Sequence, residues 1–189
     1  RFLYRVKALV EGYLKVHGTA PHTPASPDSA AARKRHIAVK TVTHDFETFS
    51  FHTAVAHLME FTHHVAGLVG DAKADPGETR ASILALLALL HPIAPHLTEE
   101  WHEQMGETRS LLVSGWPAYD PALAVEESVT VAVQVGGKLR GQVVLPRGAS
   151  REEALAAAEA QEGVAKWLEG KERLKVVYVP DRLLNVVVK

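Results

Sequence analysis

Hydrophobic residues in the first part of the chain recur at three- and four-residue steps, the period of an amphipathic α-helix. The first stripe of this kind consists of Phe2, Val6, Leu9, Val10 and Tyr13. Residues 83–90 differ because they are apolar on every side, which predicts the central helix of a bundle. Residues 1–113 are therefore expected to form an all-α helical bundle.

Prolines and capping residues predict where these helices begin and end. Ser26, Pro27 and Asp28 make a favourable helix start, with Ser26 as the N-cap. Pro92 and Pro95 must interrupt or kink the chain after the central helix, because neither has a backbone donor. The residues near 48–50 allow a further break, since β-branched, aromatic and hydroxyl side chains weaken helix propensity there.

The period changes to two near residue 129, which indicates β-strands. Valines alternate with small or polar residues from Val129 to Val135, so one face of this strand is expected to be buried. A capping box at Ser150 and Glu153 predicts an alanine-rich helix, and a second hairpin follows around residues 180–182. The predicted order is β-β-α-β-β. Residues 129–189 then form a small α+β domain, joined to the bundle by a linker at residues 114–128.

The register of the first predicted hairpin determines where its cations lie. A two-residue turn at Gly136 and Gly137 would put both Lys138 and Arg140 on the valine face. A three-residue loop that includes Lys138 instead pairs apolar residues with each other, and we choose it for that reason. It pairs Val135 with Leu139, Val131 with Val143 and Val129 with Leu145. It also places Arg140 opposite Gln134, with Gln142 alongside on the outward face.

Composition and charge narrow the classes of function. The chain has 21 basic and 22 acidic residues, a formal net charge of −1, which excludes a uniformly basic nucleic-acid binder. It contains no cysteine, which excludes a disulfide framework, a thiolate metal site and a thiol nucleophile. The longest apolar run is far shorter than the roughly 20 residues that a membrane-spanning helix needs. We expect a cytoplasmic protein without a membrane partner.

Motifs for catalysis are missing from the sequence. It has no glycine-rich phosphate loop, no His-Glu-x-x-His and no Gly-x-Ser-x-Gly. The two histidines of a pair, such as His91 and His96, are not three or four residues apart, the spacing that two metal ligands on one helix usually show. We therefore predict no catalytic residue and no metal site.

Binding is better supported by two groups of cations. Lys138 and Arg140, with Gln134 and Gln142 nearby, could contact phosphates or the 2′-hydroxyl edge of RNA. The alternative is that these cations protect a sheet edge from pairing. A second group, Arg33, Lys34 and Arg35, lies early in a helix, where the macrodipole disfavours positive charge. This group is also a candidate for RNA binding, and the alternative is a solvated run.

Three segments resemble a known family. Residues 51–60, Phe-His-Thr-Ala-Val-Ala-His-Leu-Met-Glu, and residues 91–101, His-Pro-Ile-Ala-Pro-His-Leu-Thr-Glu-Glu-Trp, resemble two helices of class I aminoacyl-tRNA synthetases. Residues 133–141, Val-Gln-Val-Gly-Gly-Lys-Leu-Arg-Gly, resemble a C-terminal hairpin of bacterial-type leucyl-tRNA synthetases. This hairpin argues against the valyl and isoleucyl enzymes. Gly136 stands where that family usually has Asn, and His52 also replaces an Asn.

The resemblance implies a function and a set of partners. The chain is expected to be the anticodon-binding-type bundle and C-terminal domain of a leucyl-tRNA synthetase, holding the body of leucine tRNA. The "HIGH" and "KMSKS" signatures of the family are not found, so the fragment itself is expected to be non-catalytic. ATP and Mg²⁺ would bind in the catalytic domain of the parent chain, which is an expected partner. We expect a monomer. A protein-interaction module without an RNA role is the alternative.

Overall fold

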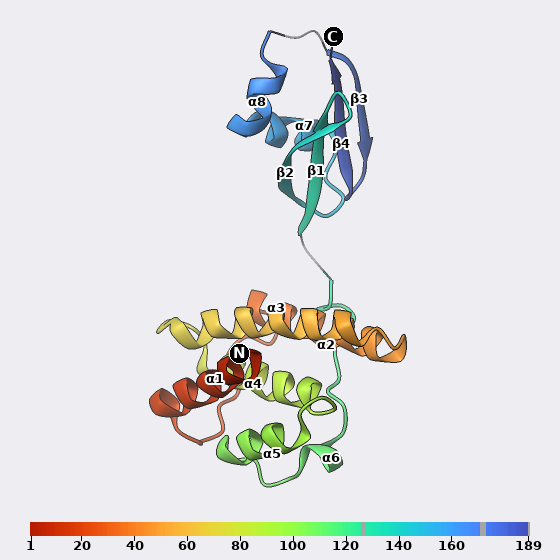
Figure 1. Ribbon diagram of the computed structural model, residues 1–189. Coiled ribbons are helices and arrows are strands. Elements are labelled where there is room, and N and C mark those ends of the chain that lie inside the picture. Colours follow the sequence, from red (N-terminus) through yellow and green to blue (C-terminus); the bar gives the residue numbers. More distant parts are fainter. Residues whose placement is uncertain (126–127, 171–172, 189) are drawn as a thin grey trace. The chain divides into compact units, whose positions relative to one another are not determined.

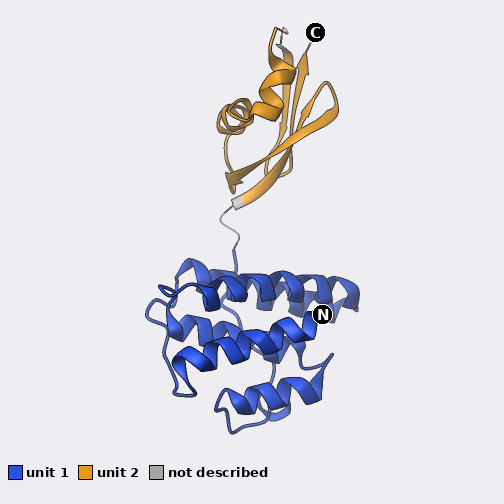
Figure 2. Cartoon of the chain, turned by 60° about the vertical axis from the view of Figure 1, so that its left-hand side comes forward, with its two compact units in different colours: residues 1–125 blue, residues 126–189 orange. Residues whose placement is uncertain are grey.

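The computed structural model describes residues 1–125, 128–170 and 173–188. The chain divides into two compact units, residues 1–125 and 126–189 (Figures 1 and 2). The elements are, in order, α1 (Phe2–His17), α2 (Ala30–Glu47), α3 (Phe51–Gly70), α4 (Pro76–Leu90), α5 (Pro95–Gln104), α6 (Leu111–Ser114), β1 (Ser128–Val135), β2 (Lys138–Pro146), α7 (Arg151–Glu159), α8 (Glu162–Leu168), β3 (Arg173–Val179) and β4 (Leu183–Val188). A helical unit is thus followed by a small four-stranded unit, as predicted.

Helix α4 is the centre of the helical unit. Its side chains are buried on several sides, and Ile83, Leu86, Leu87, Leu89 and Leu90 are each at most 1% exposed. Helices α1, α2, α3 and α5 all contact it. Burying a side chain of this size contributes roughly 1.5–3 kcal/mol, so the apolar run supplies much of the core of the unit. The predicted central helix is confirmed.

Two of the predicted helix boundaries are confirmed. Helix α4 ends at Leu90, and α5 begins with Pro95 in its first turn. Helix α2 ends at Glu47 and α3 begins at Phe51, with the intervening Phe49 at a φ of 56°. The chain therefore breaks where the sequence allowed it.

The predicted start of α2 is wrong. Its N-cap is Ser29, whose Oγ accepts a hydrogen bond from the Ala32 backbone N–H at 3.1 Å. The Ser26 hydroxyl instead donates to the Asp28 carboxylate at 3.0 Å. Residues 27 and 28 form a turn, so the helix begins only at Ala30 and Ser29 stands at its N-cap.

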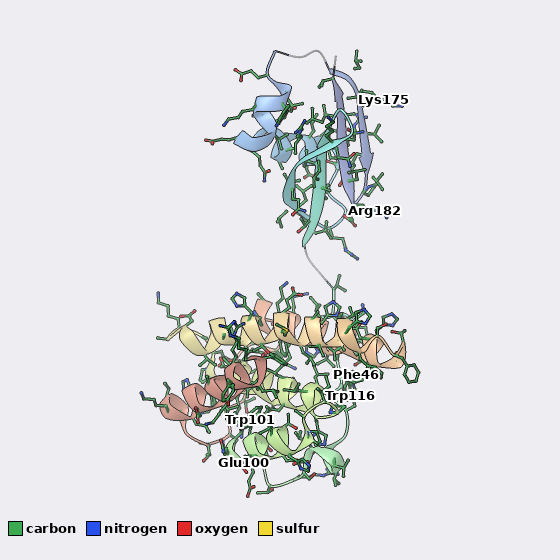
Figure 3. The ribbon with its side chains drawn as sticks, in the orientation of Figure 1. Phe46, Glu100, Trp101, Trp116, Lys175 and Arg182 are labelled. Carbon is green, nitrogen blue, oxygen red and sulfur yellow. The ribbon has the colours of Figure 1, made fainter. Side chains whose placement is uncertain are left out.

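The linker prediction also needs correction, because residues 114–125 belong to the helical unit. Trp116 Nε1 donates a hydrogen bond to Thr43 Oγ1 at 2.7 Å. The Trp116 ring also lies edge-on to Phe46, with ring centroids 5.4 Å apart (Figure 3). These contacts bury apolar surface that a solvated linker would expose. Residues 126–127 of the predicted linker lie outside the described residues.

The second unit is a four-stranded sheet with helices on one face (Figure 1). The strand order is β2-β1-β4-β3, with β1 and β4 parallel and the other neighbours antiparallel. Valines of β1, Leu184 and Val186 pack against α7 and α8. The capping box at Ser150 is present. Two helices connect the strand pairs where one was predicted, because Gln161 has extended backbone and separates α7 from α8.

Candidate nucleic-acid interface

The tip of the β1–β2 hairpin carries the first group of candidate residues. Val135 pairs with Lys138 across a two-residue turn made by Gly136 and Gly137. Both glycines have positive φ, 60° and 78°. This is the geometry of a type I′ turn, which needs left-handed backbone at both positions and therefore favours glycine. The predicted three-residue loop is wrong.

A β-bulge at Arg140 explains the error. Val133 pairs with Gly141, whereas Gln134 pairs with Leu139, so one residue of β2 is left without a partner. The bulge takes up the residue that a longer loop would have held. Further from the tip the register is as predicted, with Val131 opposite Val143 and Val129 opposite Leu145.

Arg140 and the two glutamines lie on opposite faces of the sheet. Gln142 pairs with Ala132, and Gln134 follows Ala132 at a two-residue step, so both glutamines lie on the face away from the helices. The Arg140 guanidinium is 3.4 Å from the ring centroid of Trp167 in α8, on the helix-covered side. The predicted position of Arg140 opposite Gln134 is therefore wrong, because the bulge redirects it.

The surroundings of Arg140 hold it in one orientation. The stacking on Trp167 is a cation–π contact, worth about 0.5–2 kcal/mol. Arg140 Nε is buried and has no hydrogen bond within the described residues. A Cβ added to the neighbouring Gly141 would lie 2.9 Å from Val164 Cγ2, so α8 packs tightly against the strand at this point. Arg140 is thus partly committed to the packing of α8.

Lys138, in contrast, is exposed on an anchored turn. The Gly136 N–H donates to the Val186 carbonyl at 2.9 Å, and the Gly137 N–H donates to Asn185 Oδ1 at 3.3 Å. These bonds tie the turn to β4 and present Lys138 from a supported position. The φ of 60° at Gly136 is a conformation that Asn also tolerates.

The Arg33, Lys34 and Arg35 group is divided by the fold of the helical unit. The Arg35 guanidinium donates two hydrogen bonds to Glu78 of α4, at 2.8 and 3.1 Å. The Glu78 side chain is only 2% exposed, so this ion pair is largely buried. Arg33 Nε donates to the Asp28 carbonyl at 3.3 Å, and Lys34 is exposed. Packing thus accounts for Arg35 without an RNA contact.

Two residues that shape the hairpin site were missed in the sequence. Trp167 stacks under Arg140, and Asn185 supports the turn. Trp167 is the single aromatic residue of the short helix α8, and a lone tryptophan in the same small domain as a cationic hairpin is the signal that could have pointed to it. Asn185 interrupts a run of apolar residues in the last strand, which is a similar signal.

In residues 1–125, 128–170 and 173–188, no group of three or more His, Asp or Glu side chains is placed to hold a metal ion. His57 Nδ1 instead lies 2.6 Å from Asp45 Oδ2, a contact that links α3 to α2. Across the same described ranges, none of the helices combines the length and hydrophobicity needed to cross a bilayer.

Comparison with known proteins identifies the class of protein. Residues 28–155 match the model of the family described as the anticodon-binding domain of tRNA ligase. This match covers more than half of the chain, and the chain therefore belongs to that family.

The similar proteins are leucine–tRNA ligases, which confirms the resemblance expected from the sequence. The chain is 40% identical, over its full length, to the leucine–tRNA ligase of Chlorobium phaeobacteroides (strain BS1). It is 41% identical over 161 residues, 85% of the chain, to that of Sorangium cellulosum (strain So ce56). These matches span only 22% and 18% of the two relatives.

A solved structure also matches the whole chain. It is the crystal structure of the ternary complex of Agrobacterium radiobacter K84 agnB2 LeuRS with tRNA and LeuAMS. The TM-score is 0.74 and the identity 29%, with all of this chain and 24% of that chain covered. These findings favour a leucyl over a valyl or isoleucyl relationship.

Proposed function

We propose that this chain binds leucine tRNA as part of a leucine–tRNA ligase. The observation that carries the proposal is the full-length similarity to a synthetase solved with tRNA. Ligation, with its ATP and Mg²⁺, is assigned to a catalytic domain of the parent chain, and the 189 residues themselves to holding the tRNA. We also infer a cytoplasmic, monomeric protein.

Lys138 is the first contact that we propose. Lys138 is exposed beside a turn that two hydrogen bonds hold to β4. Because the backbone of the turn is already ordered, a contact between Lys138 and a phosphate would cost little further backbone entropy. Arg140 is a second, with one face of its guanidinium on Trp167. Gln134 and Gln142 lie on the other face of the sheet and would therefore meet a different part of the RNA. Arg33 and Lys34 remain candidates in the helical unit.

Titration of a leucine tRNA transcript at several salt concentrations tests the proposal. Affinity should fall steeply with salt, because each phosphate contact releases counterions. The Lys138→Ala variant should lower the slope of log K against log salt by about 1. Lys166→Ala is the matched control, since it removes an exposed lysine from the same unit. Equal losses in the two variants would show a response to net charge and contradict the role of Lys138.

Arg140 needs a charge-conserving variant because it also packs against α8. Arg140→Lys keeps the positive charge but loses the planar guanidinium. If Arg140 contacts RNA, Arg140→Ala should weaken binding more than Arg140→Lys. A tRNA with a short variable arm is the specificity control. Binding of this tRNA as tight as that of leucine tRNA would refute a leucine-specific function.

A further inference from the structure

The stacked pair of Arg140 and Trp167 offers a ligand more than the packing of the second unit uses. The Arg140 guanidinium lies over the Trp167 ring, 3.4 Å from its centroid. Among the described residues, the guanidinium has no ion pair and no hydrogen-bond acceptor. An arginine side chain carries five N–H donors, so the fold leaves this whole set of donors unpaired.

The nitrogens of Arg140 differ in their exposure. Nε is buried without a hydrogen-bond partner, whereas the two terminal nitrogens, which also lack a partner within the described residues, are not buried. The cost of leaving a buried donor unpaired is comparable with the gain from one cation–π contact. The stability of the unit therefore gains little from this placement of Arg140, and a ligand at the exposed NH₂ groups would account for it.

Contacts between α8 and β2 hold the pair in place. Gln161 Nε2, at the start of α8, donates a hydrogen bond to the Gln142 carbonyl of β2 at 2.7 Å. Gly141 has no side chain, which lets Val164 of α8 pack directly against the strand. A surface that is ordered in advance loses little conformational entropy when a ligand binds.

A planar ligand can use both parts of this surface. Trp167 is 41% exposed, so part of its ring remains accessible beside Arg140. A phosphate would bind the guanidinium through its oxygens and would make no use of the exposed indole. A nucleobase can stack on an aromatic ring or on a guanidinium plane, and its edge can accept hydrogen bonds from the terminal NH₂ groups. The chemistry of the pair therefore favours a base over a phosphate.

Because the chain is proposed to bind tRNA, we propose that Arg140 and Trp167 form a stacking site for an unpaired nucleobase of that RNA. This site depends on the proposed function and specifies which part of the RNA it recognises. Its contact differs in kind from that of Lys138. A phosphate contact releases counterions and makes binding salt-dependent, whereas a stacked base makes its contribution without releasing them.

A short oligoadenylate and an abasic oligomer of the same length are the two probes that test the proposal on the full chain. Both carry the same phosphates, so they differ only in their bases. At low salt the oligoadenylate should bind about fivefold more tightly or better, because even a weak base–aromatic stack contributes that factor. It should also change the tryptophan fluorescence, which the abasic oligomer should leave unchanged.

Variants of Trp167 connect this preference to the stacked pair. Trp167→Leu keeps an apolar side chain but removes the ring, so it should abolish the preference for the oligoadenylate. Trp167→Phe keeps a ring and should retain most of the preference. Phe49→Leu is the matched control, since it removes a 79% exposed aromatic ring from the helical unit, and it should leave the preference unchanged.

Leucine tRNA gives a second measurement. Trp167→Leu should weaken its binding about 5-fold to 150-fold, the range for the loss of one stacked base. The slope of log K against log salt should stay the same, because no cation is removed. If Trp167 only positioned Arg140 for a phosphate, the slope would fall by about 1.

Three results would overturn the proposal. They are an affinity of the parent chain for the oligoadenylate no greater than that for the abasic oligomer, equal effects of Trp167→Leu and Phe49→Leu, and a salt slope that Trp167→Leu lowers by about 1. The first comparison needs no variant, so it decides even if Trp167→Leu unfolds the second unit. The proposed function stands in each case if leucine tRNA still binds the parent chain. Absence of that binding would contradict the proposed function, and the two probes would still decide on the stacking site.

Discussion

The ion pair between Arg35 and Glu78 leads to a quantitative prediction. Arg35→Met keeps much of the side-chain volume but removes both hydrogen bonds that the guanidinium donates to Glu78. The Glu78 carboxylate, which is 2% exposed, would keep the hydrogen bond that it accepts from the Ser82 hydroxyl at 3.0 Å. Removing one partner of a buried pair costs about 3–5 kcal/mol, because the remaining charge stays buried without compensation. This is a large part of the roughly 5–15 kcal/mol that stabilises a domain.

Urea unfolding followed by tryptophan fluorescence measures this loss. In a Trp167→Phe background the remaining tryptophans, Trp101 and Trp116, both report on the helical unit. With a slope near 2 kcal/mol per molar urea, the midpoint should fall by about 2 M. Lys34→Met is the matched control, since Lys34 is exposed next to Arg35 in the sequence, and it should change stability little.

The double variant decides whether the reasoning is right. Replacing both partners, as in Arg35→Met with Glu78→Leu, removes the uncompensated charge and should recover stability to within about 1 kcal/mol of the parent. A single Arg35→Met variant that loses less than about 1 kcal/mol would refute the account, since that is the cost of an exposed pair. A double variant no more stable than Arg35→Met would refute it as well.

Three further predictions concern single positions. Gly141→Ala should lower the free energy of unfolding of the second unit, measured in urea, by about 1–3 kcal/mol, because the added Cβ would crowd Val164. Gly148→Ala is the comparison: its Cβ would have open space, but its φ is 77°, so this variant shows the cost of backbone strain alone. Burial lowers the pKa of His64 in the folded state; the charge of Lys34 adds to this effect and that of Glu78 opposes it. The contribution of His64 to stability should therefore be full above about pH 6.5 and fall as the pH drops below that value. His64→Gln should flatten this pH dependence in thermal unfolding. Asn185→Ala should cost about 0.5–1.5 kcal/mol and speed amide exchange at Gly137, and unchanged exchange would contradict the role of Asn185.

Features set by neighbours in the chain could be predicted from the sequence. The apolar run of α4, the prolines before α5 and the capping box at Ser150 each act within a few residues, and all three are present. The two candidate groups of cations were found in the same way, from their spacing.

Features set by contacts between distant parts of the chain could not be predicted from the sequence. The bulge at Arg140 lies against α8, a distant segment that places Trp167 under the guanidinium and Val164 next to Gly141. The alternation of apolar and polar residues shows only which residues share a face of the hairpin. The same alternation is compatible with a three-residue loop and with a two-residue turn followed by a bulge. The role of Arg35 likewise depends on Glu78, which lies in another helix.

The pairing of β1 with β4 has a consequence for how the second unit folds. β1 is the first strand of the sheet in sequence and β4 is the last, yet the two are neighbours at its centre and run parallel. Two antiparallel hairpins can form locally, but the loop between them must close before the central pair can form. During synthesis, the β1–β2 hairpin must therefore wait for the whole of β4 to leave the ribosome before the central pair can form. Until then the valine face of the hairpin lacks the buried partners Leu184 and Val186, which makes this interval the one most exposed to aggregation.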